Sequence, residues 1–119
     1  MTPFGQRLRD LRQSKKLNQK QMAAALNVSG AYLSALEHGH RAAPSFDFVQ
    51  RVTGYFNVIW DEAEELQRLA TLSDPNITID TSGMAPEATE LANLLAQRIG
   101  TMEKVELQHM LDALRNPKG

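Results

Sequence analysis

The stretch that decides the fold runs from Leu17 to Gly39 and reads LNQKQMAAALNVSGAYLSALEHG. It predicts two short helices separated by a tight turn. Asn18 is a favourable cap for the first helix, and Gln21 stands three residues later, where it can complete a capping box. Asn27 tolerates the left-handed geometry that ends a helix, and Ser29 can cap the second helix.

Apolar residues in this stretch recur at helical spacing and predict a buried face. They are Met22, Ala23, Leu26, Val28, Leu33 and Leu36. Consecutive alanines keep the first helix thin, so that another helix can approach it closely. A thin helix, a tight turn and a second capped helix are typical of the helix-turn-helix motif, whose second helix enters the major groove of DNA. The alternative is an ordinary helical hairpin in a small bundle.

The order of residues in this stretch resembles the XRE family, the group of phage lambda repressor and Cro. The resemblance is carried by Leu17, Gln19, Met22, Ala23, Val28, Ser29, Leu33, Ser34, Leu36, Glu37 and Gly39. It covers roughly the first half of the chain, up to about Phe56. It implies a bacterial protein with an all-α fold, in which a five-helix lambda repressor-like DNA-binding domain forms the N-terminal part.

Residues 1–73 are predicted to form this helix-turn-helix DNA-binding domain. The first helix opens at Thr2 and Pro3, and Ser45 caps the fourth. The fifth helix is expected to run from about Ile59 to Leu72 with a broad apolar stripe. That stripe consists of Trp60, Ala63, Leu66, Leu69, Ala70 and Leu72. This apolar face is too wide for a helix that packs on the surface without a further partner.

Residues 74–85 are predicted to be a linker, because proline, glycine, asparagine and aspartate interrupt the periodic pattern there. Polar residues alternate with Ile77 and Ile79, which also allows a short strand. A single strand is not stable alone, so a strand here would need a partner, for example its twin from another subunit.

Residues 86–119 are predicted to form a C-terminal helical hairpin whose first helix opens at Pro86. Gly100 and Thr101 are expected to stop that helix and to cap the last one, and the pair Asn116–Pro117 to end it. So short a segment cannot bury two apolar stripes by itself. The hairpin must therefore pack on the first domain or on a second copy, and we expect it to be the dimerisation element.

The composition bounds the class of protein. The 119 residues include no cysteine, which excludes disulfides, thiolate zinc sites and thiol catalysis. No apolar run approaches membrane length and no signal peptide opens the chain, so a soluble cytoplasmic protein without membrane contact is expected. No nucleophile–base pair, phosphate loop or metal cluster is visible, so neither an enzyme nor a bound cofactor is expected.

Charge is distributed unevenly along the chain. The net charge is only −1, but the residues up to Phe56 include eight basic and three acidic side chains. The residues from Asn57 onward include five basic and eleven acidic ones. A basic half followed by an acidic half is consistent with one part that faces DNA and another that faces elsewhere.

The resemblance places the DNA contacts at the starts of both motif helices and in the loop after the second. The expected DNA-binding residues are Gln19, Lys20, Ser29, Gly30, Ala31, Tyr32, Ser34, His38, His40 and Arg41. Directly after the capping serine, relatives often carry glutamine or serine, whereas this chain has Gly30 and Ala31. Neither residue has a hydrogen-bonding side chain, so specificity would depend on Tyr32, on His38 or His40, and on DNA shape.

Several of these polar residues have competing interpretations. Gln19 and Arg41 occupy positions at which the family contacts phosphate. Glu37 could accept from a cytosine, but a structural pair with a basic group is favoured. His38 and His40 suggest a metal pair, yet no third ligand lies near them in sequence, so no metal site is expected.

The combined prediction is a sequence-specific transcriptional regulator that binds double-stranded DNA as a homodimer at an inverted-repeat operator. A repressor is favoured over an activator, because a small two-part protein has little surface for recruiting polymerase. One alternative is an antitoxin that regulates its own operon, although its tail would be disordered alone, whereas this tail is predicted to be helical. Another is a protein–protein adaptor, against which the basic half argues. The sequence identifies neither the operator nor a small-molecule effector.

Overall fold

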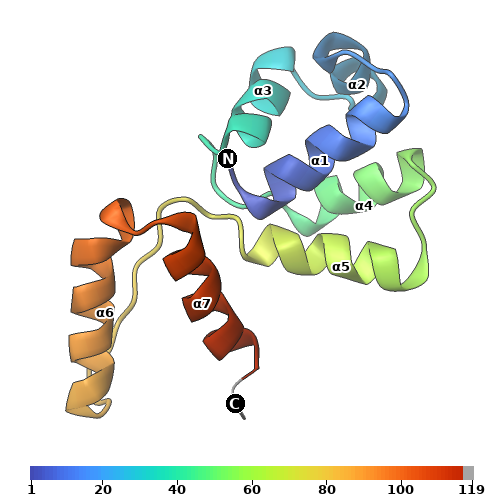
Figure 1. The fold of residues 1–119 in the computed structure, drawn as a ribbon. Coiled ribbons are helices and arrows are strands. Elements are labelled where there is room, and N and C mark those ends of the chain that lie inside the picture. Colours follow the sequence, from blue (N-terminus) through green and yellow to red (C-terminus); the bar gives the residue numbers. More distant parts are fainter. Residues whose placement is uncertain (117–119) are drawn as a thin grey trace. The chain divides into compact units, whose positions relative to one another are not determined.

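The part of the chain that the computed structural model describes, residues 1–116, is built of helices and contains no strand (Figure 1). Its elements are α1 (Pro3–Ser14), α2 (Gln19–Leu26), α3 (Gly30–His38), α4 (Phe46–Tyr55), α5 (Trp60–Thr71), α6 (Pro86–Arg98), the 3-10 helix η1 (Ile99–Thr101) and α7 (Lys104–Arg115). They form two compact units, unit 1 from Met1 to Ile77 and unit 2 from Thr78 onward. The predicted all-α fold class is confirmed. None of the helices within residues 1–116 is long and apolar enough to cross a membrane.

The first four helices begin at the side chains that the sequence predicts as caps. At α2 the cap is reciprocal: the Gln21 N–H donates to Asn18 Oδ1 at 2.7 Å, and the Asn18 N–H donates to Gln21 Oε1 at 2.9 Å. The caps of the other three helices are Thr2, Ser29 and Ser45. A left-handed residue follows α2 as expected, with φ of 58° at Asn27, and another follows α3, with φ of 76° at Gly39.

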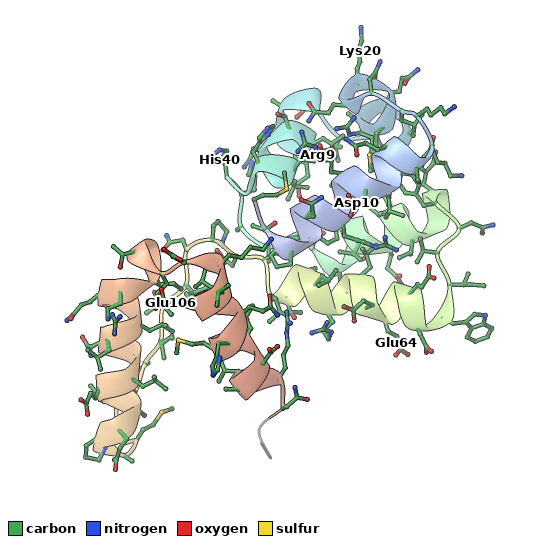
Figure 2. All side chains as sticks on the ribbon, in the orientation of Figure 1. Arg9, Asp10, Lys20, His40, Glu64 and Glu106 are labelled. Atoms are coloured by element: carbon green, nitrogen blue, oxygen red, sulfur yellow. The ribbon has the colours of Figure 1, made fainter. Side chains whose placement is uncertain are left out.

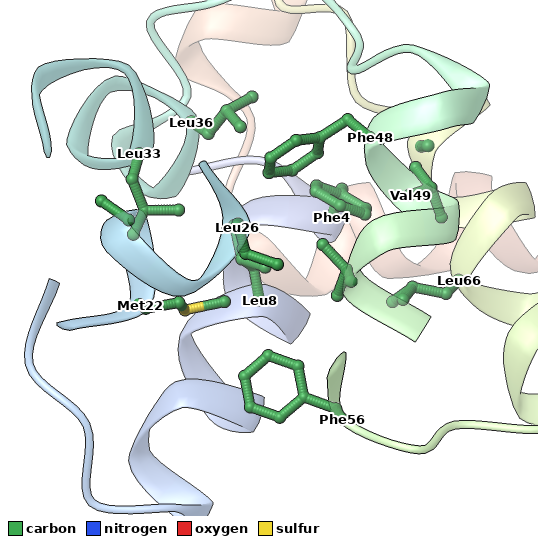
Figure 3. Packing of buried hydrophobic residues seen from close by; sticks show 13 residues of the cluster. Phe4, Leu8, Met22, Leu26, Leu33, Leu36, Phe48, Val49, Phe56 and Leu66 are labelled. Carbon is green, nitrogen blue, oxygen red and sulfur yellow. The ribbon is translucent and has the colours of Figure 1, made fainter. Parts of the chain in front are cut away.

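The core of unit 1 lies among α1–α5, and Figure 3 shows its packing. The buried apolar residues are Phe4, Leu8, Met22, Ala23, Leu26, Leu33, Leu36, Phe48, Val49, Val52, Phe56, Leu66 and Ala70. The motif helices pack on their neighbours, α3 on α1 and α2 on α4. The stripe of α5 is only partly buried, because Trp60 begins the helix and Leu72 follows its end, and they remain 81% and 57% exposed.

Hydrogen bonds at Ser73 join the two ends of unit 1. The Ser73 hydroxyl oxygen accepts from the Phe4 N–H at 2.8 Å, and the hydroxyl donates to the Leu69 carbonyl at 2.6 Å. Ser73 is buried, so these bonds satisfy polar groups that water cannot reach. The Phe4 amide in the first turn of α1 is thus hydrogen-bonded to a residue that lies two positions beyond α5.

Gly5 allows α1 to approach α3 closely. A Cβ at this position would lie 2.6 Å from the Leu36 carbonyl oxygen, which belongs to the backbone of α3. We expect Gly5→Ala to lower the free energy of unfolding by about 1–3 kcal/mol, because α3 would have to move. Gly54→Ala is the matched control and should be neutral or slightly stabilising, because an added Cβ there meets nothing within 4 Å. Urea denaturation compares the two variants. Equal stabilities would show that α3 can move away from the added Cβ without loss of stability.

Unit 2 contains two amphipathic helices, α6 and α7, in which no residue is buried. A largely apolar hollow of about 410 Å³ lies against them. It is lined by Leu91, Leu94, Leu95, Arg98, Met102, Glu106, His109 and Met110. The apolar stripes are therefore not enclosed within the single chain. Asn116 follows α7, as predicted, and Pro117, which was predicted to end the hairpin with it, lies outside the described residues.

The predicted start of the last helix is wrong. The sequence suggests Thr101 as its cap, but Thr101 belongs to η1, and α7 begins at Lys104 after the cap residue Glu103. Glu106 explains the difference, because its Oε1 accepts from the Glu103 N–H at 3.1 Å. Glu106 is the third residue of α7, and its carboxylate stabilises a helix that begins after Glu103 rather than after Thr101.

Residues 74–85 form neither a helix nor a strand in the described chain. Asp74 and Asp80 each accept from the backbone N–H two residues later, at 3.0 Å from Asn76 and at 2.9 Å from Ser82. Hydrogen bonds from the Ser82 side chain and backbone hold the pKa of Asp80 below its usual value. A strand that pairs with another subunit here stays a prediction, as do the limits of the three predicted domains.

Candidate nucleic-acid interface

The start of α3 is open to an approaching ligand. Ser29, Gly30 and Ala31 are all exposed, and the Ser29 hydroxyl accepts from the Tyr32 N–H at 3.0 Å. A Cβ on Gly30 would meet nothing within 4 Å, so the packing of unit 1 does not require a glycine there. The backbone at this position is therefore accessible to a large polymer such as a nucleic acid.

A hollow of about 420 Å³ lies beside this helix start. It is lined by Gln19, Lys20, Ala23, Ala24, Val28 and Gly30. The hollow thus brings together three of the predicted DNA-binding residues, Gln19, Lys20 and Gly30. Figure 2 shows the Lys20 side chain extending away from α2, so its ammonium group can reach an anion.

Glu37 is the buried charge that connects the motif helices to α1. Its side chain is 1% exposed, and its Oε2 and Oε1 accept from Arg12 Nε at 2.9 Å and Arg12 Nη2 at 3.0 Å. Oε1 also accepts from Gln19 Nε2 at 3.3 Å, and Arg12 Nη1 donates to the Leu17 carbonyl at 3.1 Å. The favoured interpretation of Glu37 as a structural partner of a basic group is confirmed. Gln19 is oriented by the same pair and keeps a second amide hydrogen to donate.

The two histidines at the end of α3, His38 in its last turn and His40 two residues later, lie side by side at the surface. His38 and His40 are exposed, with ring centroids 6.4 Å apart and ring planes 16° from parallel. His38 Nδ1 lies 2.8 Å from the Ser34 carbonyl oxygen, which can only accept, so Nδ1 donates. This bond fixes the His38 ring against the last turn of α3. No group of three or more metal-ligating side chains exists within residues 1–116.

Tyr32 and Arg41 contact each other, although Tyr32 is half-buried while Arg41 is exposed. The Tyr32 ring packs edge-on against Phe48, with centroids 5.6 Å apart and planes at 84°. The Arg41 guanidinium carbon lies over the same ring, 5.3 Å from its centroid. The structure thus separates the predicted site into the hollow around Gln19, the Tyr32–Arg41 pair, and the Ser34–His38–His40 group.

Comparison with known proteins assigns the N-terminal part of the chain. Residues 8–62 match the family described as Helix-turn-helix. An uncharacterized HTH-type transcriptional regulator of Bacillus subtilis (strain 168), RghRB, is 34% identical over 61 residues, which make up 51% of this chain. Residues 8–62 are thus similar to an XRE-like helix-turn-helix domain.

The compared proteins are matched over different shares of their own length. The similarity to RghRB spans only 44% of that protein's length. A solved structure of a SinR protein/SinI protein complex is 23% identical and covers 97% of this chain and 97% of that chain, with a TM-score of 0.47. Helix-turn-helix domains of this family bind DNA and are not enzymes, in agreement with the prediction from the sequence.

Arg51 supports the helix-turn-helix domain in a way that sequence reasoning missed. Its Nη1 donates to the Leu26 carbonyl at 2.8 Å, so it satisfies a carbonyl at the end of α2, and its guanidinium lies over Phe48 at 5.9 Å from the centroid. In the sequence, Arg51 counts only as one basic residue of α4. No local signal reveals the contact, because the partners are 25 residues apart.

Proposed function

We propose that this protein is a sequence-specific, DNA-binding transcriptional repressor that occupies an inverted-repeat operator as a homodimer. The observation that carries the proposal is the open start of α3, with Gln19 and Lys20 beside it and Arg41 held on Tyr32. In this motif the second helix enters the major groove while flanking donors contact phosphates. Because its ligand would be chromosomal DNA, the protein would act in the bacterial cytoplasm.

The charge distribution supports the same orientation. The residues up to Phe56 include eight basic and three acidic side chains. Lys20 and Arg41 are exposed, whereas Arg12 is engaged with Glu37 and Arg51 with Leu26. A phosphate backbone would therefore meet the free basic groups around the motif, and affinity should fall with rising salt concentration.

A homodimer is supported by the limited readout of a single domain and by the exposed stripes of unit 2. Gly30 and Ala31 provide no hydrogen bonds to bases, so one copy would discriminate poorly between sites. Leu91 and Leu94 in α6 are 54% and 46% exposed, which leaves apolar surface for a second copy. A two-fold dimer would place two copies of α3 about 34–36 Å apart, one turn of DNA, on an inverted repeat.

Genome-wide mapping of the DNA bound by the purified protein tests the proposal. Recovered sites should share an inverted repeat, and footprinting should show protection of both half-sites. Transcripts that start at these sites should rise when the gene is deleted. Falling transcripts would instead identify an activator, and binding without sequence preference would refute a specific regulator. Protection of the promoter of an adjacent toxin-like gene would favour the antitoxin alternative.

Arg41 is expected to position the domain on phosphate. Arg41→Ala should weaken binding to the operator and to unrelated DNA alike, and should lower the salt dependence of the binding constant by about one unit. Lys104→Ala removes the same charge from unit 2 and is the control. Fluorescence anisotropy at several salt concentrations measures both variants. A changed base preference with an unaltered salt dependence would contradict the phosphate role.

A further inference from the structure

The Tyr32 ring is held in a fixed orientation by the core. Its edge packs on Phe48, which is 2% exposed and itself contacts Phe4 at 6.4 Å between centroids. Figure 3 shows Phe48 and Phe4 together in the centre of unit 1. The backbone N–H of Tyr32 is also engaged, by the Ser29 cap. The ring therefore has little freedom to turn toward a base.

Arg41 contacts the Tyr32 ring but, unlike that ring, does not pack against the core. It lies in the segment between α3 and α4, outside any helix, and its side chain is exposed. A long side chain of this kind loses rotamer freedom when it binds, which weakens the net affinity. An aromatic face that already holds the guanidinium reduces that loss, because a cation–π contact orients the group before the ligand arrives.

We infer that Tyr32 is a positioning residue that presents Arg41 to the DNA backbone, rather than a reader of bases. This inference rests on the proposed function, because it assigns the means by which the same surface contacts phosphate. It differs from the sequence-based expectation, in which Tyr32 contributes to operator choice. The ring carries the role through Arg41, whereas the Tyr32 hydroxyl, which has no hydrogen-bond partner within residues 1–116, is not needed for it.

Binding measurements with the full chain separate the ring from the hydroxyl. Tyr32→Phe keeps the aromatic face and should leave affinity unchanged. Tyr32→Leu removes the face and should weaken binding by about 2- to 5-fold, the value of an exposed cation–π contact, on the operator and on unrelated DNA alike. In an Arg41→Ala background, Tyr32→Leu should cause no further loss, because the group that it positions is already absent.

Tyr55→Leu is the matched control for packing. Tyr55 is 40% exposed and packs edge-on against Phe56, with centroids 5.0 Å apart and planes at 89°. The described residues place no cation over the Tyr55 ring. The substitution therefore removes a similar ring from α4 without touching Arg41, and DNA affinity should not change. Urea denaturation of each variant shows that the proteins compared are folded.

Chemical shifts of the free protein test the contact without DNA. The side-chain protons of Arg41 should show a ring-current shift in the wild type and in Tyr32→Phe, and lose it in Tyr32→Leu. If this shift is present but no variant of the protein binds a specific site, the proposed function fails while the contact stands.

Three results would overturn the inference itself. The first is a loss in Tyr32→Phe equal to that in Tyr32→Leu, which would make the hydroxyl the DNA contact. The second is a loss confined to the operator, which would make Tyr32 a base reader. The third is an equal effect of Tyr32→Leu with and without Arg41, which would show that the two residues act independently.

Discussion

Glu37→Gln is expected to lower the free energy of unfolding by about 3 kcal/mol, because it leaves the Arg12 guanidinium largely buried without its counter-charge. The Glu37 side chain is 1% exposed and that of Arg12 is 13% exposed, so water cannot replace the lost partner. Glutamine has the same shape, but its side chain has only one acceptor oxygen, whereas the Arg12 guanidinium donates to both carboxylate oxygens of Glu37. Urea denaturation followed by circular dichroism measures the change.

The exposed pair between Arg68 and Glu65 provides the control for this prediction. Glu65→Gln should change stability little, because both side chains are about half exposed and solvent screens them. A double substitution of Arg12 and Glu37 by methionine should be more stable than Glu37→Gln alone, since no unpaired charge remains. Equal stabilities of Glu37→Gln and Glu65→Gln would show that the buried pair contributes nothing to the fold.

Removal of unit 2 after Ile77 is expected to produce the largest functional effect. Within residues 1–116, all the buried apolar residues lie in unit 1, so the shortened protein should keep the α1–α5 fold. It should be monomeric, protect one half-site and bind the operator about 10²- to 10⁴-fold more weakly, because the second contact is no longer intramolecular. Light scattering and footprinting give the two readouts.

Two substitutions in the full chain refine the experiment. Leu95→Asp places a charge beside the apolar hollow of α6, whereas Gln97→Asp adds the same charge to the same helix at an exposed polar position. Only Leu95→Asp should reproduce the truncation. If the shortened protein remains dimeric on a complete operator, the dimer surface lies in unit 1. Ile59 and Trp60, which are 60% and 81% exposed, would then be the first residues to substitute.

Local features of the fold could be predicted because their causes are local. Asn18 and Gln21 satisfy each other across three residues, and Asn27 adopts its left-handed geometry within one turn. The start of α7 shows the limit of this reasoning. Threonine is the better helix cap of Thr101 and Glu103, yet α7 begins after Glu103, because the Glu106 side chain accepts from the Glu103 N–H.

The site was harder to predict, because its geometry depends on contacts between distant residues. That Glu37 needs a basic partner follows from its place on the buried face of α3, but the choice of Arg12 among eight basic residues of that half requires the packing of α1 on α3. In sequence, Tyr32 lies at a position where the family contacts bases, but in the structure its ring packs against Phe48 of the core. Exposure at a helix start therefore cannot be inferred from position alone.

The hydrogen bond between Phe4 and Ser73 also bears on how the protein is made. Its partners are separated by 69 residues, so a growing chain displays the first helix long before it can complete the domain. Until α5 leaves the ribosome, the side of α1 that it will cover stays open to solvent and to other nascent chains. Synthesis that stalls before Ser73 would release an unclosed fragment, whereas a pause in the segment after Ile77 would allow the first unit to fold by itself.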